Sequence, residues 1–262
     1  MSFLLGTTSD DLQLEESTSA PEPSFDCGPH STASNQGSSR RSFFKMTVGG
    51  AVAGFAAAAG MEFAAPRQVL AQGGLSSDAA LQELMDGNRR FSTEHPTSWE
   101  HDLSILKQKS VDKQEPFAAV LSCADSRVPV ELLFDQTIGH IFVTRVAGNV
   151  AATEIIASLE YGAAVLGTKV ILVLAHSNCG AVKATIQAKE VPGQISALFP
   201  HIQPAVDQAG PNLEAASKAN AKIQAALLRQ SSTVISALVK ENKLKVVAGY
   251  YDLGTGVVSL LD

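Results

Sequence analysis

The sequence predicts an α/β fold in which helices flank a mostly parallel central sheet, with a helical arm on the N-terminal side. Two apolar runs, at residues 117–122 and 170–175, have the length of buried strands, and each ends in polar residues. A third candidate strand lies between them at residues 140–146, and helical patterns separate all three. Strands that alternate with helices imply βαβ crossovers, which produce parallel sheets.

The segment before the first strand has helical spacing. A helix is expected to begin after Ser76 or Ser77, because the apolar residues Ala80, Leu81, Leu84, Met85 and Phe91 recur at helical intervals. A second amphipathic piece is expected around Leu103, Ile105 and Leu106. Both pieces lie outside any βαβ unit and could form an arm on a partner subunit, although their spacing equally allows packing on their own sheet.

The remaining elements continue the alternation. Pro129 is expected in the first turn of a helix that continues through Leu133 and Phe134, and another helix is expected between Thr153 and Gly167. Further helices are expected at residues 181–190, 195–206 and 213–240. Strands are expected at residues 244–249 and 257–260, where the intervening turn favours an antiparallel hairpin at the sheet edge.

The first 71 of the 262 residues differ in composition from the rest. Residues 1–39 are rich in Ser, Thr, Gly and acidic residues, which is typical of disorder. Arg40 and Arg41 then precede an Ala- and Gly-rich apolar run at residues 46–60, and this arrangement resembles a twin-arginine export signal. We therefore expect residues 1–71 to be a disordered extension plus signal peptide, and residues 72–262 to be one domain.

The leader predicts a destination. The resemblance of this segment to a twin-arginine signal implies transfer by the twin-arginine export machinery. The destination would be a bacterial periplasm or thylakoid lumen, with Gln72 as a mature N-terminus. An uncleaved leader would instead tether the protein to the membrane. The run could also be a membrane helix beside a basic patch, but it is shorter than the roughly 20 apolar residues that a span needs. No transmembrane segment is expected in residues 72–262.

Charge and cysteine count restrict the partners of residues 72–262. Four of the 20 Lys and Arg and seven of the 26 Asp and Glu lie in the leader, which leaves a formal charge of −3. This mild acidity argues against nucleic acid as a partner. Cys27 also lies in the leader, so Cys123 and Cys179 are the only cysteines that remain, and no disulfide framework is expected.

The polar residues after the two apolar runs predict a metal site. Cys123 follows the first run, and His176 and Cys179 follow the second. Parallel strands deliver their carboxyl ends to one edge, where these side chains would form a site for one Zn²⁺ with an open fourth position. The alternatives are buried apolar thiols with a core imidazole, or a nucleophilic Cys123 of phosphatase or rhodanese type. The second alternative needs a longer loop than the one that separates Cys123 from Arg127.

Two motifs resemble those of the β-class carbonic anhydrases: Cys-x-Asp-x-Arg at residues 123–127 and His-x-x-Cys-Gly at residues 176–180. The resemblance covers roughly residues 76–262 and implies a zinc enzyme, a carbonate dehydratase, that interconverts CO₂ and bicarbonate as a homodimer or higher homo-oligomer. It implies zinc ligands at Cys123, His176 and Cys179, a catalytic dyad of Asp125 and Arg127, and substrate contacts from Gln114, Phe142, Tyr161 and the N–H of Gly180.

The chemistry of such a site explains the dyad. Two thiolates and a neutral imidazole leave Zn²⁺ near zero net charge, so it acidifies water less than a tris-histidine site does. Asp125, kept ionised by Arg127, would accept the proton of zinc-bound hydroxide and orient its oxygen toward CO₂. Two other functions stay open: hydrolysis of a CO₂ analogue such as carbonyl sulfide or carbon disulfide, and a zinc-binding assembly protein without turnover.

Overall fold

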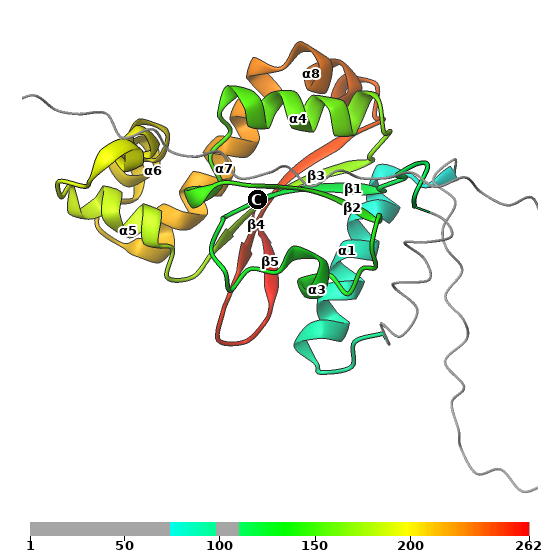
Figure 1. Ribbon diagram of the computed structural model, residues 1–262, viewed down its shortest axis with the longest axis horizontal. Coiled ribbons are helices and arrows are strands. Elements are labelled where there is room, and N and C mark those ends of the chain that lie inside the picture. Colours follow the sequence, from blue (N-terminus) through cyan, green and yellow to red (C-terminus); the bar gives the residue numbers. More distant parts are fainter. Residues whose placement is uncertain (1–73, 98–109, 262) are drawn as a thin grey trace, which may run out of the picture. The chain divides into compact units, whose positions relative to one another are not determined.

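The central feature of the fold is a five-stranded sheet with the order β2-β1-β3-β4-β5. The structure is a computed structural model that describes residues 74–97 and 110–261. The first four strands pair in parallel and β5 pairs with β4 in antiparallel fashion, which confirms the predicted class and the terminal hairpin (Figure 1). The strands are β1 (Ala118–Ser122), β2 (Ile141–Arg145), β3 (Val170–His176), β4 (Lys245–Tyr251) and β5 (Val258–Leu261).

The middle strands β1 and β3 are buried because helices cover both faces of the sheet, and their sequences are accordingly almost entirely apolar. Every residue of β1 and β3 is buried, as expected for inner strands of a parallel sheet. Register places Ser122 of β1 level with Arg145 of β2 and Leu174 of β3. The chain therefore leaves three neighbouring strands at the same edge of the sheet.

Helices cover the two faces in separate groups (Figure 1). One face carries α4 (Thr153–Ala164), α7 (Leu213–Ser231) and α8 (Thr233–Lys240), which pack Leu159, Leu228 and Ile235 against the strands. The other face carries α1 (Ser77–Ser92) and α3 (Val130–Leu133), which contribute Leu84 and Leu133. Helices α5 (Gly180–Gln187) and α6 (Phe199–Ala209) lie beyond the carboxyl edge of the sheet (Figure 1). Of the 3₁₀ segments, η2 (Ala147–Asn149) follows β2 and η3 (Gly193–Leu198) precedes α6.

Helix α1 packs on the sheet of its own chain. Ser76 caps it by accepting a hydrogen bond from the Ala79 N–H, as the sequence predicts. Asn88 is buried, and its side chain binds the carbonyls of Leu133 and Gly256 and the N–H of Val258. The amphipathic piece expected around residues 103–106 lies outside the described residues.

Three helix predictions need correction. The helix expected over residues 195–206 is the 3₁₀ segment η3 followed by α6, which begins at Phe199. The helix expected over residues 213–240 is two helices, because Ser232 adopts an extended backbone and its hydroxyl caps α8 through the Ile235 N–H. Pro129 precedes α3 rather than starting it, and α3 ends before Phe134.

The predicted leader, and its boundary at residue 71, lie outside the described residues. Within residues 74–97 and 110–261, no helix combines the length and the apolar character that crossing a membrane requires.

Candidate metal centre

The three predicted ligands converge at the carboxyl edge of the sheet. Cys123 directly follows β1, His176 is the last residue of β3, and Cys179 precedes the first turn of α5. Their ligand atoms all lie within 4.8 Å of one another, and all three side chains are buried. The crossover topology thus brings together residues that are 53 positions apart in the sequence.

The histidine ring is oriented for a cation. Its Nδ1 lies 2.9 Å from the carbonyl oxygen of Ser177, which fixes Nδ1 as the donor and leaves Nε2 with a lone pair. The ring is fully buried, and Nε2 has no hydrogen-bond partner among the described residues. A buried acceptor without a partner is unfavourable, and a cation held jointly with two sulfurs would satisfy it.

The two thiols differ in acidity. The pKa of Cys123 is lowered to about 4, chiefly by a hydrogen bond from the Cys179 side chain and also by the N–H of Gly148, while burial opposes the shift. The same contact with Cys123, together with burial, raises the pKa of Cys179 well above its usual range. Two thiols and one imidazole within reach of one another are ligands that Zn²⁺ prefers, and binding would displace the thiol protons, so the donor set fits Zn²⁺.

Asp125 and Arg127 form a bidentate ion pair beside the ligands. The Nε of Arg127 donates to Oδ1 at 2.9 Å and its Nη2 donates to Oδ2 at 2.8 Å, while the backbone N–H of Arg127 also binds Oδ1. These bonds, the side-chain contact first, hold the pKa of Asp125 well below its usual range. Oδ2 lies 3.9 Å from Nε2 of His176, so an ionised carboxylate borders the metal centre.

Two further residues contact the metal centre, and neither is predicted from the sequence. Arg145, at the end of β2, donates from Nε to the carbonyl of Cys123 at 3.0 Å and from Nη2 to the carbonyl of Asp125. The N–H of Gly148 lies 3.3 Å from the Cys123 sulfur. A basic residue at the end of a strand next to β1 is the one available signal for Arg145, and the bond to sulfur has no sequence signature.

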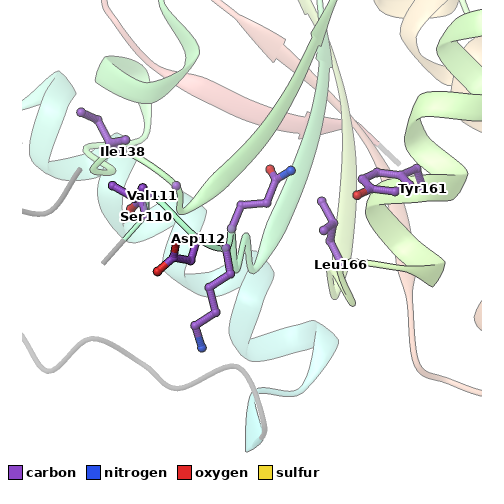
Figure 2. A pocket seen from close by; sticks show the side chains of 9 residues that line it. Ser110, Val111, Asp112, Ile138, Tyr161 and Leu166 are labelled. Carbon is purple, nitrogen blue, oxygen red and sulfur yellow. The ribbon is translucent and has the colours of Figure 1, made fainter. Parts of the chain in front are cut away.

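The predicted substrate residues divide into two groups. Gly180 directly follows Cys179 and opens α5. Gln114 and Tyr161 instead line a separate pocket of about 550 Å³, and Phe142 packs against Tyr161 with 6.3 Å between ring centroids. Figure 2 shows Tyr161 and Leu166 on one side of this pocket and Ser110, Val111 and Asp112 on the other.

The pocket lined by Gln114 and Tyr161 lies at the amino edge of the sheet. Gln114 precedes β1, Leu166 precedes β3, and Phe142 stands level with Ala119, four residues before Cys123. At about 3.3 Å per residue, Phe142 lies about 13 Å along the strands from the level of the metal ligands. Within one chain, the structure does not bring Gln114, Phe142 and Tyr161 to the metal centre, and their role in substrate binding stays a prediction.

Comparisons with known proteins agree on one family. A family model described as carbonic anhydrase matches residues 118–258. The chain is 33% identical to the carbonic anhydrase of Mycolicibacterium smegmatis over 195 residues, covering 70% of this chain and 92% of the relative. Of solved structures, the Coccomyxa β-carbonic anhydrase in complex with acetazolamide is 27% identical with a TM-score of 0.54, covering 69% of this chain and 86% of that one. The β-carbonic anhydrase CafA of Aspergillus fumigatus shares the fold, with a TM-score of 0.57, 24% identity, and coverage of 71% and 90%.

The convergence of ligands predicts metal content. The purified protein should hold about one zinc per chain, because three ligands define one tetrahedral site. Cys123→Ala and Cys179→Ala should each lose it by elemental analysis, while His201→Ala, at an exposed histidine of α6 outside the ligand set, should keep it. Circular dichroism would verify that the variants fold. Stoichiometric zinc in either alanine variant would show that the ligand set is incorrect.

Proposed function

The chain belongs to the β-class carbonic anhydrases. We propose the roles that its residues have in the reversible hydration of CO₂ to bicarbonate and a proton. The observation that supports these roles is an ionised carboxylate, Asp125, fixed by Arg127 beside the cluster of Cys123, His176 and Cys179. When bound, Zn²⁺ supplies the Lewis acidity that makes water a usable nucleophile near neutral pH. The chain's own residues would orient the reacting water and hold the carboxylate in place.

Asp125 is the hydrogen-bond acceptor that would orient the reacting water. Both its oxygens accept from Arg127, and Oδ2 also faces His176, so the carboxylate cannot rotate without breaking two charge-assisted bonds. Its lowered pKa keeps it ionised throughout the neutral range. Arg127 thereby has two roles: it maintains the charge of Asp125 and it holds the carboxylate beside the metal ligands rather than among them.

The substrate residues at the amino edge support a homodimer. Gln114, Phe142 and Tyr161 match family positions that contact substrate, yet one chain separates them from its own metal ligands. The rim near them is apolar and open to solvent, with Tyr161, Val165 and Val111 exposed at 47%, 66% and 72%. A second copy seated there would bring these residues to its partner's metal centre, so each complete site would contain residues of two chains.

We further propose that the protein leaves the cytoplasm folded, by the twin-arginine route, for a periplasm or thylakoid lumen. Support comes from Arg40 and Arg41 in their Ser-Arg-Arg-x-Phe-Phe-Lys context and from the moderately apolar run after Lys45. Cys123 and Cys179 would then reach an oxidising compartment already bound to metal, which protects them from disulfide chemistry.

Replacement of the dyad tests the mechanism. Asp125→Asn should keep its zinc and lose at least about 100-fold in CO₂ hydration, the scale of losing one orienting hydrogen-bonding group, because an amide can donate to the reacting water and misorient it. Stopped-flow hydration with parallel zinc analysis measures both. Asp86→Asn, an acid on α1 outside the site, should match the parent enzyme. Near-parental turnover by zinc-loaded Asp125→Asn would exclude the proposed role.

Subunit complementation tests the shared site. Gln114→Ala and Cys179→Ala chains are each expected to be inactive alone, but a heterodimer purified by two tags should regain activity, because one of its sites has intact metal ligands and an intact Gln114 from the other chain. The matched control pairs a parent chain with a Gln114→Ala/Cys179→Ala double variant and should be inactive. The reverse result, an active control and an inactive first pair, would place Gln114 in the site of its own chain.

The export proposal has a direct test in cells. Replacement of Arg40 and Arg41 by Lys preserves charge but removes the recognised pair, so the variant should stay cytoplasmic, full length and active. Cell fractionation with activity assays and immunoblots compares it with the parent. Equal export of the two forms would mean that residues 1–71 are not a twin-arginine leader.

A further inference from the structure

The Cys123 sulfur receives a hydrogen bond from a backbone group that is itself tightly held. Gly148 donates its N–H to this sulfur at 3.3 Å. Gly148 has φ 75° and ψ 14°, a left-handed conformation suited to glycine. A Cβ there would lie 2.7 Å from Cδ1 of Ile202 and 3.3 Å from Cβ of Ala181. A side chain there would be strained by the positive φ and would require Ile202 to move, so the position favours glycine and directs a peptide donor at a metal ligand.

The segment that contains Gly148 is clamped by two amides of α7. Asn220 Nδ2 donates to the carbonyl of Gly148 at 2.7 Å, and Gln224 Oε1 accepts from the N–H of Ala151 at 2.8 Å. Gln224 Nε2 also donates to Oδ1 of Asn220 at 3.2 Å and to the carbonyl of His201 at 3.0 Å. The two amides thus bind both ends of residues 148–151 and bind each other.

Asn220 and Gln224 are buried polar residues on a helix face that is otherwise mostly apolar. Asn220 and Gln224 are 0% and 1% exposed. Their buried neighbours on α7 are mostly apolar: Ala216, Ala219, Ala221, Ala225 and Leu228. A buried amide is unfavourable unless it is hydrogen-bonded, and an apolar residue would serve helix packing as well. Apart from the bond between them, the side-chain bonds of this pair go to backbone groups of the 148–151 segment and of α6, so the pair holds this segment in place rather than stabilising α7.

We propose that Asn220 and Gln224 are positioning residues for the metal centre, which act through Gly148 on the Cys123 sulfur. They hold the segment directly after the donating N–H, at the carbonyl of Gly148 and at the N–H of Ala151, and so fix the backbone of Gly148. The bond from the Gly148 N–H draws negative charge from the thiolate. The sulfur then donates less charge to a bound cation, which retains more Lewis acidity. The proposal rests on the metal site proposed above and extends it to residues 97 and 101 positions further along the chain.

Cobalt substitution gives a readout other than activity. A thiolate bound to Co²⁺ shows a sulfur-to-cobalt charge-transfer band, and a sulfur that loses a hydrogen bond releases an electron more easily. Asn220→Ala should therefore shift this band to longer wavelength with cobalt still at one per chain. Gln224→Met, which keeps a side chain of similar shape, should shift the charge-transfer band in the same direction. This variant provides the test if Asn220→Ala does not fold. Circular dichroism monitors folding.

Ser217→Ala is the matched control. Ser217 is a buried polar residue of α7 too, but its hydroxyl donates to the carbonyl of Leu213 within the helix. This variant should leave the band of the parent unchanged. An unshifted band in folded Asn220→Ala and Gln224→Met, or an equal shift in Ser217→Ala, would overturn the positioning role. Failure of the parent protein to bind cobalt would instead contradict the metal site itself.

Discussion

The parallel register of β1, β2 and β3 is the constraint on which the metal centre depends. Ser122, Arg145 and Leu174 stand level across the three strands, so Cys123 and His176 leave the sheet at the same edge. A slip of one residue would turn every side chain of a strand to the opposite face and separate the two ligands. Burial of β1 and β3 on both faces helps to hold the register, because a slip would expose apolar side chains or bury polar ones.

Charge at the site is graded from the interior to the solvent. The sulfurs and the imidazole are buried, Asp125 is 17% exposed, and Arg127 is 53% exposed. Arg127 can therefore fix the carboxylate while its own charge stays hydrated, which avoids most of the desolvation penalty of a buried ion pair. Arg145 complements it by holding the carbonyls of Cys123 and Asp125, so two guanidinium groups fix the short loop after β1.

The sequence predicts those parts of the site that follow from strand ends and short motifs. Cys123 and His176 could be placed together because apolar runs precede them and parallel strands share an edge. Gly148 and Asn220 act through hydrogen bonds to sulfur or to a backbone group, and such bonds leave no pattern in the sequence. Arg145 has only its place at a strand end as a signal. The amino-edge position of Gln114 and Tyr161 depends on three-dimensional placement, and the break at Ser232 depends on one capping hydroxyl within a helical pattern.

The order of elements along the chain also bears on synthesis. Strand β3, which ends in His176, is paired on one side with β4, and the carbonyl of Tyr251 accepts the N–H of Ser177 directly after that histidine. The last strand is joined to the first helix through Asn88 and the N–H of Val258, 170 residues apart. A nascent chain that has not emerged beyond residue 251 therefore lacks the neighbour that completes the histidine's side of the cluster. The sheet that carries the metal ligands is therefore complete only after residues 245–251 have joined it.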